Sequence, residues 1–371
     1  MALIPTTILT GFLGSGKTTL LKRVLTEAHG QKIAIIENEF GEENIDNDIL
    51  VSDTNEQIIQ MSKGCICCTI REDLRTTLQT LAEQKRKGEL NFDRVVIETT
   101  GLADPGPVAQ TFFMDDEIAE SFLLDSILTL VDAKHAALQL NDRQEARRQV
   151  GFADQIFISK SDLVSKPELE ALQHRLAHMN PRAPQKVVHF GEVSLAEVFD
   201  LRGFNLNAKL DIDPDFLKEE TPHVHDEHCG HDHAHDHDHD HEKAHDHHDH
   251  EHGENCNHPS HQGEGHGHHH HFDDDVKSFV FKSEKPFDPA KLEDFLGAIV
   301  NVYGPKMLRY KGVLNMNGTE RKVIFQGVHQ LMGSDLGPVW AENEVKVSKM
   351  VFIGIDLPKD ILLQGLEQCL V

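Results

Sequence analysis

The stretch that decides the fold is GFLGSGKT, residues 11–18. It matches the pattern G-x-x-x-x-G-K-[ST], the glycine-rich phosphate-binding loop, or P-loop. Residues 4–10 before it are mostly apolar and β-branched, the composition of a buried parallel strand. Apolar residues after it recur at helical spacing as far as Gly30. Because a strand, a glycine loop and a helix follow one another, the sequence predicts a nucleotide site here and not a chance turn.

The residues of the P-loop each suit a nucleoside triphosphate. Glycines let backbone N–H groups turn toward phosphate oxygens, and the start of the following helix adds positive potential. We expect Lys17 to reach the β- and γ-phosphates and the Thr18 hydroxyl to ligate Mg²⁺. The residues of this loop predicted to bind the nucleotide are Gly11, Gly14, Ser15, Gly16, Lys17 and Thr18.

A second strand supplies the acidic partner that a P-loop requires. The stretch DRVVIETTG, residues 93–101, is an apolar strand that ends in Glu98, and Gly101 follows three residues later. We assign Glu98 to Mg²⁺, directly or through water, and we expect the Gly101 backbone to approach the γ-phosphate. Taken alone, the stretch would be an ordinary buried strand and turn. Beside the P-loop, it makes Lys17, Glu98 and Gly101 the candidate catalytic residues.

The motif SKSD, residues 159–162, concerns the choice of base. It follows another apolar strand and resembles N-K-x-D, the guanine-reading motif of GTPases, with Ser159 in place of asparagine. The Asp162 carboxylate can accept hydrogen bonds from the N1–H and the N2 amine of guanine, which adenine lacks. We therefore expect GTP and not ATP as the nucleotide, with Ser159, Lys160 and Asp162 on the base side of the site.

The predicted strands of the first half alternate with helical stretches, the pattern of an α/β fold with a mostly parallel sheet. They lie at residues 4–10, 33–37, 94–98, 126–131 and 155–159. In such a sheet the ligand lies at the carboxyl ends of the strands. The sequence thus predicts a P-loop NTPase domain over residues 1–210.

The end of the chain predicts a small α+β C-terminal domain over residues 276–371. The predicted elements are strands at 278–282, 307–315, 320–328 and 347–355, a helix over 289–300 and a last helix that runs to about Cys369. Asn317-Gly318 between two of these strands is a strong hairpin signal. We expect helices to cover one face of the sheet, which makes the free face or edge a candidate docking surface.

Residues 211–275 between the two domains differ in composition. Of 27 histidines, 21 lie between His223 and His271, and residues 221–275 hold fifteen acids and one lysine. Such a segment cannot bury enough apolar surface to offset its ordering entropy, so we expect a disordered insert. Dense imidazoles offer many weak sites for Zn, Ni, Cu and Co. The insert is therefore interpreted as a metal buffer or collector, the alternative being a soluble spacer.

The charge and the apolar runs of the chain limit its partners. A formal charge of −26 argues against nucleic acid and suits a protein that attracts cations. No run of about 18 apolar residues is present that could span a membrane. The opening MALIPTTILTGFLG lacks the basic region of a signal peptide. We therefore expect a cytoplasmic protein whose cysteines are reduced.

The stretch GCICC, residues 64–68, places three of the six cysteines in four positions. Reduced, clustered thiols indicate metal binding; inert buried cysteines and a redox or nucleophilic thiol are the alternatives. A predicted helix begins at Thr69, and its dipole favours the thiolate, the form that binds zinc. Three cysteines leave a tetrahedral metal one ligand short, which a carboxylate of IENEFGE, residues 36–42, could supply reversibly. This acidic segment falls where a P-loop GTPase places a switch.

Together these motifs resemble those of the CobW-like metal-chaperone P-loop GTPases, and within that family most closely the YjiA-type zinc-binding GTPases. The resemblance covers both sides of the insert. Before it stand TGFLGSGKTTLL, IENEFGE, GCICC, VIETTGLADPGPV and SKSD, and after it LRYKGVL, FQGVHQL and FIGIDLP. The combination of a P-loop with C-x-C-C is highly specific.

The resemblance implies a Mg²⁺-dependent GTPase that binds zinc or a similar metal and hands it to a client protein. The metal ligands of the family map onto Cys65, Cys67 and Cys68, and Glu37 and Glu42 can take part. Its nucleotide residues map onto Gly14, Gly16, Lys17, Thr18, Thr19 and Asp162. The implied ligands are GTP, Mg²⁺ and Zn²⁺.

Three hypotheses about function follow. The first is a GTP-dependent metallochaperone in which hydrolysis relaxes the switch around residues 37–42 and releases metal to a client docked on the GTPase and C-terminal domains. The second is a zinc storage or buffering protein that the nucleotide mainly stabilises, and the third is a kinase or ATPase. A homo-oligomer that depends on nucleotide or metal is an open alternative. We expect the single histidines outside the insert to be ordinary surface or satisfied side chains, the alternative being that one of them is a transient metal ligand. They are His135, His174, His178, His189 and His329.

Overall fold

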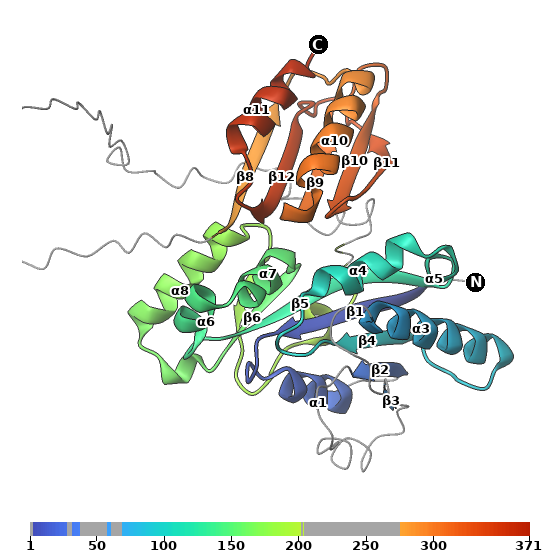
Figure 1. Ribbon diagram of the computed structural model, residues 1–371, viewed down its shortest axis with the longest axis vertical. Coiled ribbons are helices and arrows are strands. Elements are labelled where there is room, and N and C mark those ends of the chain that lie inside the picture. The colour runs from blue at the N-terminus through green and yellow to red at the C-terminus, as the bar shows by residue number, and fades with distance from the viewer. Residues whose placement is uncertain (1–2, 28–31, 38–57, 61–68, 202, 204–274) are drawn as a thin grey trace, which may run out of the picture. The chain divides into compact units, whose positions relative to one another are not determined.

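The computed structural model describes residues 3–27, 32–37, 58–60, 69–201, 203 and 275–371 (Figure 1). All of these belong to one compact unit that the two ends of the chain form together. A second unit, Leu217–Phe272, lies outside the described residues. In the part of the chain that is described, no helix is long and apolar enough to cross a membrane. The domain boundaries expected from the sequence stay predictions.

The first half of the compact unit is built around a seven-stranded sheet with the order β3-β2-β4-β1-β5-β6-β7, in which all neighbouring pairs are parallel. Its strands are β1 (Ile4–Gly11), β2 (Ile33–Glu37), β3 (Ile58–Gln60), β4 (Arg94–Glu98), β5 (Phe122–Asp132), β6 (Gln155–Ser159) and β7 (Gln185–Val187). All five predicted strands are present, which confirms the α/β fold with its parallel sheet. Strands β3 and β7 are too short to show a hydrophobic period and are not predicted from the sequence.

Helices pack on both faces of this sheet (Figure 1). They are α1 (Lys17–Glu27), α3 (Thr69–Lys87), α4 (Pro105–Met114), α5 (Asp116–Ala119), α6 (Ala136–Asp142), α7 (Gln144–Phe152) and α8 (Lys166–Met179), with 3-10 turns η1 (Ser161–Leu163) and η2 (Leu195–Glu197). In β1, Ile8 joins the apolar cluster under α3, α4, α7 and α8, whereas Leu9 joins the cluster under α1. Because successive side chains of a strand point to opposite faces, β1 is buried on both sides.

The C-terminal domain holds a five-stranded sheet of order β11-β10-β9-β12-β8, in which all neighbouring pairs are antiparallel. Its elements are β8 (Val276–Ser283), α10 (Pro289–Tyr303), η4 (Gly304–Lys306), β9 (Met307–Leu314), β10 (Arg321–Val328), β11 (Leu331–Val339), β12 (Ser348–Ile355) and α11 (Lys359–Gln368). The predicted hairpin joins β9 to β10, with Gly318 at φ +88°. The edge strand β11 is not predicted, because its exposed, glycine-containing sequence shows no alternation of apolar and polar residues. It is a strand because its backbone pairs with β10.

Helices α10 and α11 cover one face of this sheet. Tyr310, Phe325 and Phe352 belong to the buried apolar cluster between the helices and the strands. The Tyr310 hydroxyl lies 3.0 Å from the carbonyl oxygens of both His329 and Leu331. The helix-covered face predicted from the sequence is therefore present, and a tyrosine bound to main-chain oxygens ties its core to the turn between β10 and β11.

The opposite face of the C-terminal sheet is partly covered by the first domain. Val328, Val351 and Ile353 belong to the same buried apolar cluster as Phe152 at the end of α7. The sheet face that the sequence leaves free for a client is thus partly buried within the compact unit. The prediction omits this contact, because a strand's apolar alternation does not say whether a helix or another domain covers it.

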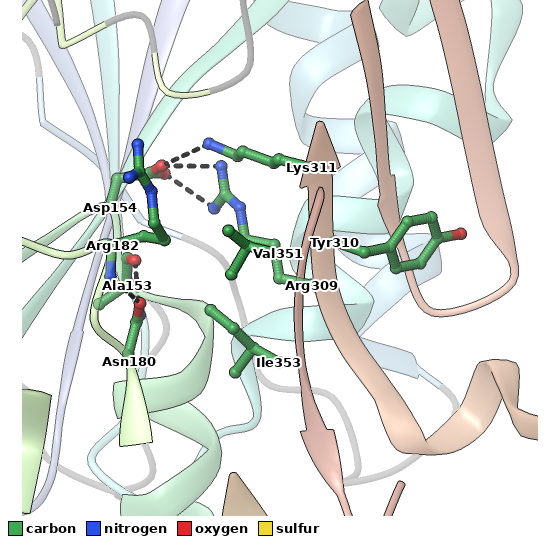
Figure 2. A pocket seen from close by; sticks show the side chains of 9 residues that line it. All are labelled: Ala153, Asp154, Asn180, Arg182, Arg309, Tyr310, Lys311, Val351 and Ile353. Atoms are coloured by element: carbon green, nitrogen blue, oxygen red, sulfur yellow. Dashed lines mark hydrogen bonds and ion pairs between the residues drawn. The ribbon is translucent and has the colours of Figure 1, made fainter. Parts of the chain in front are cut away.

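A buried acid joins the two domains (Figure 2). Arg309 of β9 donates to Asp154, with Nη1 2.9 Å from Oδ2 and Nη2 2.7 Å from Oδ1. The Lys311 ammonium lies 3.1 Å from Asp154 Oδ1, and the Ile127 backbone N–H donates to Oδ2 at 3.0 Å. Figure 2 shows Arg309 and Lys311 pointing toward Asp154 and Tyr310 pointing away, as alternation along a strand requires.

Main-chain oxygens complete the surroundings of the guanidinium. Arg309 also donates to the carbonyls of Phe152 at 3.1 Å and Gly203 at 3.0 Å. The side chains of Arg309 and Asp154 are only 3% and 2% exposed. A fully buried ion pair adds little net stability, because the cost of removing both charges from water offsets their attraction. Removing one partner is strongly destabilising, because it leaves the other charge buried without compensation.

We expect Arg309→Met to lower the free energy of unfolding by about 3–5 kcal/mol, because it leaves the Asp154 charge buried with one cation fewer. Urea unfolding followed by circular dichroism measures this. The matched control is Lys166→Met, since Lys166 pairs with Glu170 at 3.6 Å on a surface where its side chain is 86% exposed. That change should cost no more than about 1 kcal/mol. Similar small losses in both variants would contradict the importance of the buried pair.

Candidate functional site

The P-loop lies between the carboxyl end of β1 and the first residue of α1. Within it, the backbone N–H of Ser15 donates to the Phe12 carbonyl at 3.1 Å. Gly16 has φ +100°, a conformation that residues with a side chain rarely adopt. The glycine pattern of the sequence thus produces a tight turn at the start of a helix, where N–H groups and the helix dipole favour an anion.

Lys17 folds back over the loop. Its Nζ donates to the Gly11 carbonyl at 2.9 Å, and the side chain is buried. Burial lowers the pKa of Lys17, and the Glu98 carboxylate raises it in part. An ammonium in this position can exchange a carbonyl partner for phosphate oxygens, which are stronger, charge-assisted acceptors.

The loop also holds an unused hydroxyl. The Oγ of Ser15 is buried, and the described part of the chain offers it no hydrogen-bond partner. Leaving such a group unsatisfied costs about 1–3 kcal/mol, which a phosphate oxygen would relieve. The orphan hydroxyl, the buried ammonium of Lys17 and the helix start therefore fit the phosphates of a nucleotide.

Thr18 at the start of α1 and Glu98 at the end of β4 face each other. Their oxygens, Thr18 Oγ1 and Glu98 Oε1, lie 3.5 Å apart. Hydroxyl, carboxylate and phosphate oxygens are the ligands that Mg²⁺ prefers. The structure thus brings together the two residues that the sequence predicts for Mg²⁺, and their chemistry fits that ion.

Gly101 lies against the P-loop. A Cβ at this position would come within 2.5 Å of the Leu13 backbone nitrogen, so the approach requires glycine. Gln149 of α7 fixes the segment that contains Gly101, because its Nε2 donates to the Gly101 and Ala103 carbonyls at 3.2 and 3.0 Å. Gln149 is not predicted from the sequence, because nothing in its helical neighbourhood separates it from a surface glutamine.

One of the residues predicted to lie on the base side of the site is hydrogen-bonded to the P-loop. Ser159 Oγ donates to the Ser15 carbonyl at 2.7 Å, so the residue that replaces the GTPase asparagine holds the P-loop. Lys160 has a left-handed backbone at φ +56°, and its Nζ donates to Asp132 at 2.7 Å. Asp162 lies in η1 just beyond and is exposed to solvent. Thr19 follows Thr18 in α1 and is exposed as well.

Asp132 at the end of β5 fixes Lys160 in place. Its side chain is 1% exposed and also receives His135 Nδ1 at 2.8 Å. Burial alone would raise the pKa of Asp132, but hydrogen bonds from Lys160 and His135 outweigh it and lower the pKa. Glu98 is predicted as a site residue because it is an acid at the carboxyl end of a strand. Asp132 also ends a strand, β5, so the same argument from the sequence could have predicted it.

The predicted zinc ligands lie outside what the structure describes. The residues concerned are Cys65, Cys67, Cys68 and Glu42, together with the side chain of Glu37. Across the described ranges, no group of three or more His, Cys, Asp or Glu side chains could hold a metal ion. The one described cysteine, Cys369, is buried among apolar residues beside α11.

The backbone on either side of these ligands is described. Strand β2 ends at Glu37, and α3 begins at Thr69 directly after the cysteines, as predicted. The register of the sheet pairs Glu37 with Glu98 across β2 and β4. The backbone of a predicted zinc ligand therefore lies next to the backbone of the predicted magnesium ligand.

Comparison with known proteins agrees with this site. Residues 5–186 match the family model of the CobW/HypB/UreG nucleotide-binding domain, and residues 276–370 match the cobalamin synthesis protein CobW C-terminal domain. The zinc chaperone YjiA of Escherichia coli strain K12 is 37% identical over 357 residues, 96% of each chain. The zinc chaperone CobW of a Sinorhizobium species is 27% identical over 380 residues, 95% of this chain and 93% of that protein.

A solved structure extends the agreement to the whole fold. The crystal structure of the Zn(II)-bound YjiA GTPase from E. coli is similar with a TM-score of 0.72 and 33% identity, over 100% of this chain and 99% of that chain. The fold and the phosphate loop are those of the P-loop NTPases. Within that class, the chain belongs to the CobW family. This confirms the resemblance that the sequence motifs predict.

We expect Ser159→Ala to weaken GDP and GTP binding about fivefold, because one hydrogen bond that anchors the P-loop is lost. Ser159→Thr keeps the hydroxyl and should bind nucleotide within about twofold of the wild type. Fluorescent-nucleotide titration measures both. Adenine nucleotides, which share the phosphates, should weaken by the same factor. A loss confined to guanine nucleotides would show instead that Ser159 reads the base.

Proposed function

We propose that the chain is a GTP-hydrolysing metallochaperone that binds zinc, or a similar transition metal, at Cys65, Cys67 and Cys68 and delivers it to a client protein under nucleotide control. The observation that carries this proposal is the pairing of Glu37 with Glu98 in the parallel sheet. Similarity to zinc chaperones along nearly the whole chain supports it.

The nucleotide side of the mechanism rests on described residues. GTP would supply the γ-phosphoryl group, and Mg²⁺ would help to neutralise the charge that develops during its transfer. Lys17 is placed to bind the phosphates, and Thr18 and Glu98 are placed to hold Mg²⁺. Gly101 brings its backbone to the P-loop at Leu13, which suits a donor to the γ-phosphate. These roles require positioning and electrostatics and no covalent step by the protein.

The base side selects guanine. Asp162 accepts from the N1–H and N2 amine of guanine, while Lys160, held by Asp132, keeps the loop in its left-handed turn. The Ser159 hydroxyl bonds the P-loop to the end of β6. It thereby takes over the structural role of the asparagine amide that this motif lacks.

The metal side lies between two described elements. Cys65, Cys67 and Cys68 precede the first residue of α3, where the helix dipole favours thiolates. A carboxylate of Glu37 or Glu42 completes a tetrahedral zinc site and is the ligand that can be withdrawn. Here zinc is the cargo, and the nucleotide controls how tightly it is held.

The pairing of β2 with β4 gives this control a physical route. Glu98 would hold Mg²⁺ beside the γ-phosphate, and the neighbouring strand β2 ends at Glu37, its register partner, where the predicted switch segment begins. A nucleotide changes metal affinity only by binding two conformations differently, and the effect is reciprocal. Hydrolysis of GTP then weakens one ligand and releases the metal.

A client is proposed to dock on the GTPase and C-terminal domains. Among the described strands, β11 lies at one edge of its sheet, and most of its side chains are exposed. An extended segment of another protein can add to such an edge through main-chain hydrogen bonds. The edge strand is therefore the described surface best suited to a client.

Zinc storage is the second candidate function, favoured by the 21 histidines between His223 and His271. Many weak imidazole sites hold metal without any client. Storage requires no difference in zinc affinity between nucleotide states, whereas a chaperone requires one. The two functions therefore separate in a single titration.

We expect zinc affinity of the full-length protein to differ tenfold or more, about 1.4 kcal/mol, between its GTP-analogue and GDP states. Zn²⁺ would be titrated against a competing chelator with GTP analogue and Mg²⁺, with GDP and Mg²⁺, and without nucleotide. The variant Cys65→Ser/Cys67→Ser/Cys68→Ser serves as control, because it keeps the histidines and loses the thiolates. The difference between the two proteins isolates the C-x-C-C site. Equal wild-type affinities in all three states would favour storage.

We expect Asp162→Asn to weaken GTP binding roughly thirtyfold, since hydrogen bonds to a charged acceptor are lost. Asparagine can donate to the O2 carbonyl of xanthine, so the variant should bind xanthosine triphosphate better than GTP. Competition against a fluorescent nucleotide measures the order. If GTP and ATP already bind the wild type equally, Asp162 does not select the base and the third hypothesis, an ATPase or kinase, gains support.

A further inference from the structure

His329 lies in the turn that joins β10 to β11 of the C-terminal domain. Its backbone N–H donates to the Met307 carbonyl at 3.0 Å, and its own carbonyl accepts from the Tyr310 hydroxyl at 3.0 Å. The backbone is left-handed at φ +52°, and the side chain is buried. Since left-handed residues other than glycine are uncommon, the C-terminal sheet holds this imidazole in a constrained place.

The imidazole contacts the start of α4 in the N-terminal domain. A Cβ built on Gly106 would come within 2.6 Å of His329 Nε2, so the ring fills the space beside that glycine. The ring of Phe152 meets the imidazole edge-on, with centroids 5.3 Å apart. Nδ1 lies 3.3 Å from the Gly304 carbonyl. Burial lowers the pKa of His329, and Asp104 raises it in part.

The start of α4 is bonded to the loop that approaches the P-loop, residues 101–104, here called the Gly101 loop. Asp104 caps the helix, with Oδ1 accepting from the Gly106 N–H at 2.9 Å and Oδ2 accepting from Arg148 at 2.7 Å. The next residue of α7, Gln149, donates to two carbonyls of the Gly101 loop. A displacement of α4 at Gly106 therefore moves Asp104 at one end of the loop, and through Arg148 it reaches α7, whose Gln149 holds the other end.

We propose that His329 is a positioning residue for GTP hydrolysis, which fixes the start of α4 and so holds the Gly101 loop against the P-loop. The proposal rests on the GTPase function proposed above. It also names the contact by which the C-terminal domain acts on the nucleotide. A client that pairs with β11 would shift the turn that carries His329, and by reciprocity the γ-phosphate would alter the client's affinity.

The contact acts on turnover more than on nucleotide binding. Lys17 and Ser159 hold the P-loop through bonds to Gly11 and Ser15, which do not involve α4. The Gly101 backbone is placed for the γ-phosphate, which GDP lacks. A loosened Gly101 loop therefore lowers kcat for GTP and leaves GDP affinity unchanged.

The first test is His329→Asn in the full-length protein. Asparagine tolerates the left-handed backbone and shortens the side chain away from Gly106 and Phe152. We expect kcat for GTP to fall about tenfold, with GDP affinity within about twofold of the wild type. The thermal unfolding midpoint is measured alongside. An unchanged kcat overturns the proposal, as does a common loss of kcat, GDP affinity and stability, which would indicate a merely structural role.

The second test approaches the contact from the other side. Gly106→Ala places a methyl group where the imidazole lies and should lower kcat by a similar factor. In the double variant with His329→Asn, the closest clash is relieved, while Phe152 Cζ and Asp104 Oδ1 would still lie 2.9 and 3.1 Å from the new Cβ. The combined loss of kcat should therefore be smaller than the sum of the two single losses. Additive losses would show that Gly106 and His329 act independently, contrary to the proposal.

Gly297→Ala is the matched control, because it makes the same chemical change in α10 where no atom lies within 4 Å of the new Cβ. It should leave kcat within about twofold, since it changes only local helix propensity. Absence of GTP turnover in the wild type overturns the proposed function together with this inference. Turnover that His329→Asn leaves unaltered overturns the inference alone.

Discussion

The parallel register at the centre of the N-terminal sheet is the constraint on which the rest of the site depends. Strands β2, β4 and β1 lie side by side, so their carboxyl ends open at one edge, and the P-loop, Glu98 and the end of β2 meet there. A slip of one residue between β2 and β4 would move Glu37 out of line with Glu98 and turn every side chain of β2 to the other face. Two burial clusters, one on each face, hold the register in place.

Helix α7 contacts both the Gly101 loop of its own domain and the C-terminal domain. Near its end, Gln149 supports the Gly101 loop, and the final residue, Phe152, packs against the imidazole of His329. The Phe152 carbonyl accepts from Arg309, beside the buried carboxylate of Asp154. One short helix thus contacts the nucleotide machinery along one stretch and the C-terminal sheet at its end. A rigid element between two sites is the kind of connection through which conformational states are coupled.

What could be predicted from the sequence has local causes. The P-loop, the acid that ends β4 and the hairpin at Gly318 each depend on residues within a few positions of one another. Gln149 could not be predicted, because its partners, the carbonyls of the Gly101 loop, lie far away in the chain. Strand β11 pairs with the preceding strand, β10, but its exposed sequence shows no alternation that would reveal it. Likewise, Arg309, the ion-pair partner of Asp154, comes from the C-terminal domain, and no sequence pattern links the two residues. The metal-binding role of Cys65, Cys67 and Cys68 stays a prediction, because these residues lie outside the described part of the chain.

Strand β12 sets the order in which the C-terminal domain can be built. It pairs with both β8 and β9, so an inner strand of this sheet comes from a segment that follows all the other strands of the sheet in the chain. Domains generally fold as units, the N-terminal one first, as the chain leaves the ribosome. On the nascent chain, β8 must then wait for β12, its neighbour in the sheet, until residues beyond Ile355 have emerged. The sheet therefore closes only after Ile355 has emerged, and a chain that stops before Ser348 would leave β8 and β9 as unpaired, aggregation-prone edges.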